Sequence, residues 1–161
     1  IVEKVNAESQ EDFTLELEPI TAFLDEYWIE VEDFETQAKE RANTSITVLE
    51  NKERYNPNRV PKTVKLQIGS KEANIIFNGS FDTRLSSNPL GARQMFYIVN
   101  SISSEAADAD GIWNQLGYEY SLVGDDTVYK VMVGGKYSQN GIISSHHIEM
   151  EFHGDENGGV S

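Results

Sequence analysis

The first long pattern of apolar positions along the chain has the spacing of an amphipathic helix. Apolar residues recur at alternating intervals of three and one, at Ile20, Phe23, Leu24, Tyr27, Trp28 and Val31. These intervals place all of them on one face of a helix with 3.6 residues per turn. Pro19 suits the first helical position, which needs no backbone N–H. The pattern predicts a helix over Pro19–Ala42. Because apolar and acidic residues also alternate within Trp28–Phe34, a strand is the alternative for that segment.

A second helical pattern begins near residue 88. Asn88 can cap a helix, and Pro89 fits its first position. Apolar residues then recur at Ala92, Met95, Phe96, Val99 and Ile102. This spacing predicts a helix from Asn88 to Ile102. Asp108 or Asp110 can cap a short third helix that carries Ile112, Trp113 and Leu116.

The remaining apolar patterns alternate with a period of two, which is typical of half-buried strands. Such strands are predicted at 13–17, 44–49, 64–68, 75–77, 118–122 and 128–133. The last strand alternates most regularly, with Ile148, Met150 and Phe152 on one face and His147, Glu149, Glu151 and His153 on the other. Asn140–Gly141 predicts a hairpin turn before it.

This order of elements predicts an α+β fold, with a mostly antiparallel β-sheet and two amphipathic helices packed on one face. The length of 161 residues fits a single domain. We place that domain at residues 13–153, after an acidic arm at 1–12 and before a glycine-rich tail at 154–161. Chain ends of this composition are often poorly ordered, so we expect both to be flexible.

Charge is distributed in three blocks that differ in sign. Residues 1–40 hold 13 acidic and 2 basic residues, residues 41–100 hold 4 and 9, and residues 101–161 hold 10 and 2. The net charge of −14 disfavours nucleic acid and anionic membranes as partners, because both are bound through Lys and Arg. The blocks can neutralise one another inside one folded chain, which is the simpler interpretation, and the alternative is that opposite charges of neighbouring subunits meet and direct self-association.

The sequence lacks the motifs of common catalytic chemistries. Cysteine is absent, which excludes disulfides, thiol nucleophiles and cysteine metal sites. Gly134–Gly135–Lys136 lacks the first glycine of a phosphate-binding loop, and no serine lies in a nucleophile-elbow pattern. No apolar run approaches the ~20 residues of a membrane helix. We therefore expect no enzymatic activity, no cofactor and no membrane insertion.

The last strand carries a weak candidate for a metal site. His147, Glu149, Glu151 and His153 alternate on one strand face, so neighbouring pairs could share a cation. A zinc site needs three or four ligands, and His146, the other histidine, is expected on the opposite face. We favour the alternative, in which these side chains form a solvated polar face and bind no metal.

Two groups of residues are candidates for binding a partner. The first is the basic segment, with Arg54, Tyr55, Arg59, Lys62 and Lys65, which can meet an acidic neighbour. The second is an aromatic group near loops, with Trp113, Tyr118 and Tyr120. Aromatic side chains that retain a polar group are common at interfaces. For Trp113, packing in the core is the alternative, because Ile112 and Leu116 flank it.

The predicted order of helix, strands, helix and further strands resembles that of small oligomeric assembly subunits, including neck and tail proteins of tailed phages. The resemblance implies a non-catalytic structural subunit that forms a homo-oligomer, such as a virion component. The sequence leaves the location open and favours a virion or the outside of the cell over the location of a cytosolic enzyme. It is a likeness of architecture and rests on no motif. The alternative function is an extracellular or cell-surface binding module for a carbohydrate or a protein, which we expect to be monomeric with exposed aromatic side chains.

Overall fold

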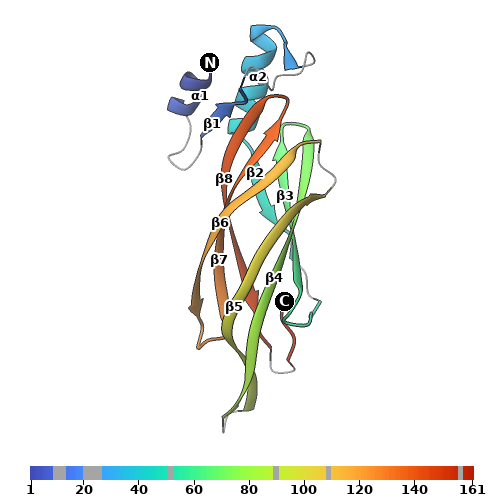
Figure 1. Cartoon of the computed structure of the whole chain (residues 1–161), viewed down its shortest axis with the longest axis vertical. Helices are drawn as coiled ribbons and strands as arrows, with labels where there is room; N and C mark the ends of the chain where they lie inside the picture. Colours follow the sequence, from blue (N-terminus) through green and yellow to red (C-terminus); the bar gives the residue numbers. More distant parts are fainter. Residues whose placement is uncertain (9–13, 20–26, 51–52, 89–90, 108–109, 156–157) are drawn as a thin grey trace.

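The fold is a two-layer arrangement of antiparallel strands with two helices at one end (Figure 1). The computed structural model describes residues 1–8, 14–19, 27–50, 53–88, 91–107, 110–155 and 158–161. Sheet A has the strand order β1-β8-β7-β6, and sheet B has the order β2-β3-β4-β5. The prediction of an α+β fold with mostly antiparallel sheet is confirmed.

Strands that follow each other in the chain are mostly neighbours in a sheet, as antiparallel hairpins allow. Sheet A contains β1 (Leu15–Leu17), β6 (Ile112–Val123), β7 (Val128–Gln139) and β8 (Ile142–His153). Sheet B contains β2 (Ser45–Val48), β3 (Val60–Ile68), β4 (Lys71–Asn88) and β5 (Gly91–Ala107). The helices are α1 (Val2–Glu8) and α2 (Val31–Ala42).

The main hydrophobic core lies between the two sheets. At its centre, the ring of Phe81 on β4 lies 5.0 Å from Phe96 on β5, 5.7 Å from Tyr129 on β7 and 4.9 Å from Phe152 on β8, measured between ring centroids. Phe81 and Phe152 are fully buried. Aromatic pairs at these distances add to the stabilisation from buried area, so this cluster holds the sheets face to face.

A smaller core attaches the helices to one end of sheet A. Val5 of α1, Leu15 of β1, Ala38 of α2 and Ile142 of β8 form a buried cluster. The predicted arm at 1–12 therefore includes a helix that buries Val5. In the predicted tail, Val160 is fully buried and forms β-bridges to Tyr55 and Gly154. Whether either end is flexible in solution stays a prediction.

The two sheets are joined along one side by β5 and β6. Trp113 Nε1 donates a hydrogen bond to Ser104 Oγ at 2.8 Å, and Gln115 Nε2 donates one to the carbonyl of Ile102 at 2.7 Å. These bonds link strands of different sheets. On the opposite side of the molecule, a groove separates β2 from β8.

The helix predicted at Asn88–Ile102 is wrong, because this segment forms β5. β5 pairs with β4 along its length, from Asn88↔Gly91 to Asn74↔Ala107. The register shifts at Ser80/Phe81 and Asp82/Thr83. Such irregularities disturb the simple alternation by which strands are recognised, so the apolar spacing appeared helical. Asn88, which suggested a helix start, is the last residue of β4, and Pro89 lies outside the described residues.

The helix predicted at Pro19–Ala42 is confirmed only in its last part, α2. Residues 20–26 lie outside the described part of the chain, Tyr27 lies in a short turn, and Trp28–Glu30 are irregular. Val31–Phe34 are helical, so the alternative of a strand is wrong. Trp28 and Val31 are 61% and 67% exposed, so the described end of the predicted apolar stripe is not a core face.

The short third helix is also wrong, because Ile112–Leu116 belong to β6. Of its three apolar residues only Trp113 is buried. The predicted strands at 44–49, 64–68, 118–122 and 128–133 and the last strand are confirmed in outline by β2, β3, β6, β7 and β8. Asn140 and Gly141 have φ values of 53° and 79° and join β7 to β8, as a two-residue hairpin turn requires.

The β4–β5 hairpin extends well beyond the strands beside it (Figure 1, lower end). β3 pairs with β4 only as far as Val60↔Gly79, whereas β4 and β5 pair as far as Asn88↔Gly91. The backbone of Phe96 is still tied to the β6–β7 turn, where its N–H donates to the carbonyl of Asp126 at 2.8 Å. We call the part beyond this bond, Thr83–Asn88 and Gly91–Met95, the hairpin arm.

Candidate interaction surface at an open strand edge

One edge of β8 has strand partners at its two ends but none in its middle, within the part of the chain that is described. β1 pairs only with Ile142–Ser144. Next to this pairing, the N–H of Ser145 donates to the carbonyl of Thr14 at 3.0 Å. At the other end, His153 and Ser161 exchange two backbone hydrogen bonds of 2.8 and 2.9 Å.

Between Ser145 and His153, every second residue of β8 directs its backbone N–H and C=O groups to the side away from β7. In an antiparallel strand, alternate residues direct their N–H and C=O groups to the same side. Because Ser145 and His153 bond away from β7, His147, Glu149 and Glu151 also direct their backbone groups away from β7. No described residue bonds to these groups. Among the described residues, the middle of β8 is therefore a strand edge without a partner, of the kind that can accept a further strand.

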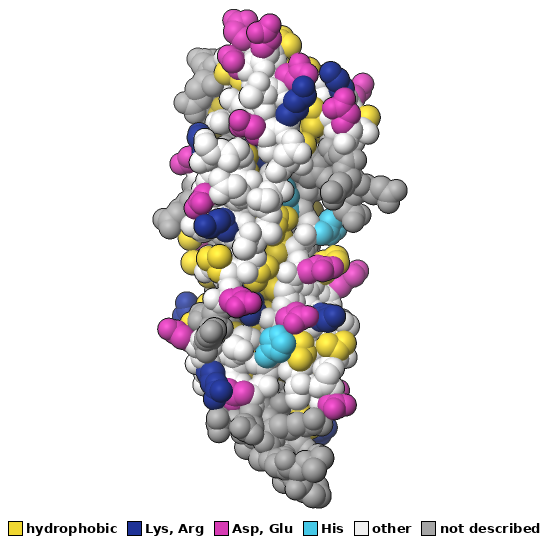
Figure 2. All heavy atoms as spheres, turned by 180° about the vertical axis from the view of Figure 1, so that it is seen from behind, with side chains coloured by type: hydrophobic (Ala, Val, Ile, Leu, Met, Phe, Trp, Pro, Cys, Tyr) yellow, Lys and Arg dark blue, Asp and Glu magenta, His cyan; other side chains and the backbone are white. Residues whose placement is uncertain are grey.

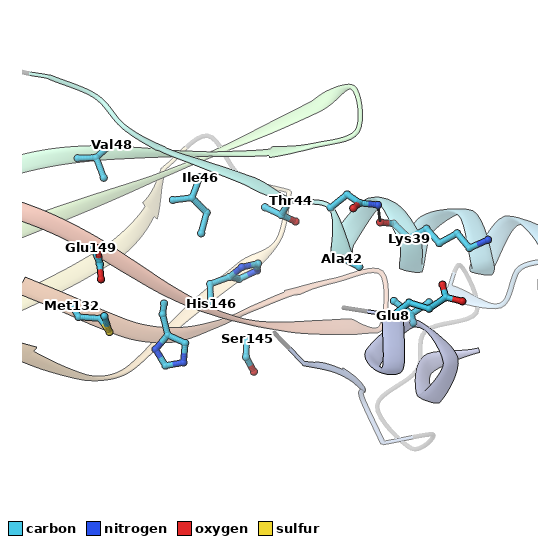
Figure 3. A pocket seen from close by; sticks show the side chains of 13 residues that line it. Glu8, Lys39, Ala42, Thr44, Ile46, Val48, Met132, Ser145, His146 and Glu149 are labelled. Atoms are coloured by element: carbon cyan, nitrogen blue, oxygen red, sulfur yellow. Dashed lines mark hydrogen bonds between the residues drawn. The ribbon is translucent and has the colours of Figure 1, made fainter. Parts of the chain in front are cut away.

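A groove of about 1040 Å³ runs beside this edge. Its walls are Ile46 and Val48 of β2 on one side and His146 and Glu149 of β8 on the other, while Lys39 and Ala42 of α2 close one end. Figure 3 shows the side chains of β2 pointing across the groove toward β8. β2 is itself the first strand of sheet B. The groove thus separates two strand edges, one from each sheet.

The surface around the groove is mixed in character. All three histidines of the chain, His146, His147 and His153, lie in β8, so the face that shows histidine in Figure 2 is the one along which β8 runs. On this face, exposed hydrophobic atoms lie along the middle, and acidic side chains are spread over its length (Figure 2). An incoming strand would therefore meet both apolar and acidic side chains.

Arg41 anchors α2 to the β7–β8 hairpin. Its side chain is 3% exposed. Nη1 donates hydrogen bonds to the carbonyls of Tyr137 and Ile142 at 2.9 and 3.2 Å and to Ser144 Oγ at 3.2 Å. Nη2 donates to the carbonyl and the side-chain oxygen of Gln139, each at 3.3 Å. Burial lowers the pKa of Arg41 to about 10, which still leaves it charged at neutral pH.

His146 lies at the base of the groove beside this anchor. Its Nε2 is 2.7 Å from Ser144 Oγ, within hydrogen-bond distance. Burial, together with the charge of Arg41 and the neighbouring His147, lowers the pKa of His146 to about 4, so the ring is neutral at pH 7. A serine beside a histidine is the geometry of an activated nucleophile. Here Ser144 is fully buried, accepts a hydrogen bond from Arg41 and lies within hydrogen-bond distance of the carbonyl of Tyr137, so its hydroxyl is held within the core.

The candidate metal residues lie as the alternation predicted. His147, Glu149, Glu151 and His153 are exposed on the outer face of sheet A, and the side chain of His146 is buried on the inner face. Only His153 and Glu151 are in contact, with Nε2 and Oε2 3.1 Å apart. Among the residues that the structure describes, no three His, Asp or Glu side chains are grouped to hold a metal ion.

The candidate aromatic residues are divided between core and surface. Trp113 is 8% exposed and packs edge-on against Phe77, with ring centroids 6.2 Å apart. Tyr118 and Tyr120 are 36% and 53% exposed, with ring centroids 6.3 Å apart. A register shift between Gln115 and Gly117 separates them from Trp113. The exposed part of the predicted aromatic group is therefore the tyrosine pair.

The candidate basic residues do not form one surface. Arg54 is paired with Asp155 at 2.8 Å, and Lys65 with Glu72 at 3.4 Å. Lys62 turns toward β8, where its Nζ lies 5.0 Å from the ring centroid of Phe152, and burial lowers the pKa of Lys62. Arg59 is exposed, and Tyr55 is half-buried against the main core. Whether these side chains contact a partner stays a prediction.

Sequence reasoning missed the groove and the residues beneath it. Arg41 appeared in the sequence only as a basic residue near a helix end, where such residues are common. Ser144 and His146 do alternate with exposed residues of β8, which indicates burial, but not that Arg41 binds between them. The open edge had no signal in the sequence, because it depends on how far β1 extends along β8.

None of the helices in the described part of the chain is long and apolar enough to cross a membrane. Comparisons of the chain with protein-family models, with curated proteins and with solved structures found no match.

Proposed function

We propose that this protein is a non-catalytic assembly subunit that forms a homo-oligomer. The observation that carries the proposal is the hairpin arm. It is a ribbon of two strands that extends beyond the end of β3, and an isolated two-stranded hairpin is at best marginally stable in water. A neighbouring molecule that covers the arm would therefore stabilise it.

The charge of the arm supports association with an acidic protein. The arm contains Arg84 and Arg93 and no acidic residue, whereas the whole chain has a net charge of −14. A basic extension can therefore approach the acidic surface of another copy of the chain. The arm thus adds a second cationic segment to the predicted basic segment, in which Arg54 and Lys65 are paired within their own chain. A place in a virion, as a neck or tail component, remains a finer form of the same proposal.

The test is the mass in solution of a variant with a shortened arm. Arg84 and Met95 face each other in the ladder, so Asn-Gly can join them directly in a tight turn. We expect light scattering to find a multimer for the unaltered chain and a monomer for the shortened one, with the same far-ultraviolet circular dichroism. An unaltered chain that stays monomeric at all concentrations and salt conditions would refute the proposal.

A charge-reversed variant serves as the matched control. Arg54→Glu removes the ion pair with Asp155 but leaves the arm intact, so we expect the mass of the multimer to be unchanged. If Arg54→Glu yields a monomer and the shortened arm does not, then the basic segment is the interface. The self-association would then stand, while the role of the arm would be wrong.

The second candidate function is a monomeric binding module for a carbohydrate or a protein. The exposed pair Tyr118 and Tyr120 favours it, because adjacent exposed aromatic rings can stack on a sugar or cover an apolar group. It predicts that the chain is a monomer and that Tyr120→Ala abolishes binding to a glycan on an array. A multimer whose glycan signals are unaffected by Tyr120→Ala would exclude it.

A further inference from the structure

We propose that the hairpin arm of one copy adds as a strand to the open edge of β8 in the next copy. This inference rests on the proposed self-association and names the surfaces that meet. It assigns the arm as the donor and His147–Glu151 as the acceptor.

The acceptor has the hydrogen-bonding groups and the length that a strand requires. His147, Glu149 and Glu151 each direct a backbone N–H and a C=O to the open side, between the bonds made by Ser145 and His153. At ~3.4 Å per residue, the distance along β8 from Ser145 to His153 is about 27 Å. A strand of five or six residues spans about 17–20 Å and fits between the two existing partners.

The donor has a matching edge. The N–H of Phe96 points away from β4, since it bonds to Asp126. By alternation along β5, the backbone groups of Gln94 and Ala92 point the same way, toward the outside of the arm. The arm can therefore offer an edge of β5 without breaking its pairing with β4. Main-chain bonds between two such edges give β-augmentation its affinity.

Charge favours a contact between the arm and the open edge of β8 over a contact between two open edges. The acceptor carries Glu149 and Glu151 on its exposed face, and the arm carries the basic residues Arg84 and Arg93. Two acceptor edges placed together would bring like charges into contact, which is unfavourable across a strand pair. A donor and an acceptor of opposite charge attract each other. The contact is thus between arm and edge rather than between two identical edges.

The contact joins different surfaces and is therefore heterologous. The arm lies at one end of the molecule, and the open edge lies along its side toward the helices (Figure 1). Head-to-tail contacts of this kind close into rings or continue as filaments. Each copy then uses one arm and one edge.

The test blocks each edge separately with proline. The N–H of Glu149 lies on the open side, so Glu149→Pro removes a hydrogen-bond donor from the open edge and leaves the ladder with β7 intact. Gln94→Pro does the same to the arm. We expect each variant alone to be monomeric by light scattering. A mixture of the two should give a 1:1 dimer and nothing larger, because one intact arm and one intact edge remain.

Cross-linking provides a measurement that does not depend on proline being tolerated. The chain has no cysteine, so Glu151→Cys mixed with Gln94→Cys reports one contact between copies. We expect a disulfide-linked dimer in this mixture. None should form with Glu72→Cys, which is exposed beside the β3–β4 turn in sheet B and not in the sheet that contains the open edge.

The outcomes separate the inference from the proposed function. If Glu149→Pro and Gln94→Pro keep the mass of the unaltered multimer while folded, the chain self-associates by another surface and the inference is wrong. The same conclusion follows if Glu72→Cys cross-links to the arm as well as Glu151→Cys does. A monomeric unaltered chain refutes both.

Discussion

Arg41 shows how a single charged side chain can determine the position of a helix. Its described partners are carbonyl and hydroxyl oxygens of β7, the β7–β8 turn and β8, and no described carboxylate pairs with it. A buried cation is tolerated only when its N–H groups are hydrogen-bonded. The five hydrogen bonds of Arg41 meet this need, and they do so only when α2 lies against the hairpin.

Replacing Arg41 is expected to destabilise the protein strongly. Arg41→Met fills a similar volume but leaves buried carbonyls without donors, which should lower the free energy of unfolding by about 3 kcal/mol. The control is Lys39→Met, which removes an exposed charge paired with Glu35 in the same helix. It should change stability only slightly, because exposed ion pairs contribute little. Urea unfolding measures both, and equal effects would contradict the anchoring role of Arg41.

His146 gives the stability of the fold a dependence on pH. Its pKa is about 4 in the folded chain and about 6.5 when unfolded. The unfolded chain therefore binds a proton first, and stability falls as the pH drops below 6.5 and levels off below 4. Arg41 and His147 are the charged and titratable groups that act on it.

The change expected from His146 can be isolated with His146→Gln, which keeps a polar group beside Ser144. Between pH 7.5 and pH 5, the unaltered chain should lose about 2 kcal/mol more than the variant. Acidic residues titrate equally in both proteins, so the comparison removes their contribution. Equal losses in urea unfolding at the two pH values would show that His146 is not responsible.

At the scale of elements, regular strands were predictable and irregular ones were not. β8 alternates without interruption, and its buried and exposed faces are those the sequence predicted. β5 and β6 each lie in a pairing with a register shift, and both were predicted as helices in part. Helix α2 was located, but its start was not, because apolar residues at helical spacing continued into a segment that is exposed.

The same distinction applies to the candidate surfaces. The outer face of β8 follows from alternation alone, so its His and Glu residues were found. The open edge depends on the pairing of Leu15–Leu17 with residues more than a hundred positions later, which no local pattern contains. The arm was hidden because its strand was interpreted as a helix.

Packing between β6 and β7 depends on one glycine. A side-chain carbon at Gly135 would overlap the ring of Trp113 and approach the carbonyl of Asn114 at 3.0 Å, whereas at Gly134 it would meet only His147 at 3.8 Å. Gly135→Ala should therefore cost about 1–3 kcal/mol through overpacking, and Gly134→Ala should have little effect. Thermal unfolding compares the two, and Trp113 fluorescence should shift only in the first. Equal melting temperatures would show that Trp113 moves without cost.

At the scale of the whole molecule, the described ion pairs connect the charge blocks in different ways. Arg54–Asp155 joins the basic block at 41–100 to an acidic block. Lys65–Glu72 lies within the basic block, and Lys136–Glu16 joins the two acidic blocks. These pairs are partly exposed and contribute little to stability. The separation of charge along the chain is available to contacts between molecules, as the proposed self-association requires.

The order of strands along the chain also determines which sheet can form first during synthesis. Sheet B uses residues 45–107 and can form while the ribosome is still making sheet A. β1 is made early but pairs with β8, the last strand, so Leu15 must wait for Ser144. Contacts this distant in sequence form late. In the interval the inner face of sheet B, with Val64, Leu66 and Phe77, has no covering layer. A nascent chain halted before β6 is therefore the form most exposed to aggregation.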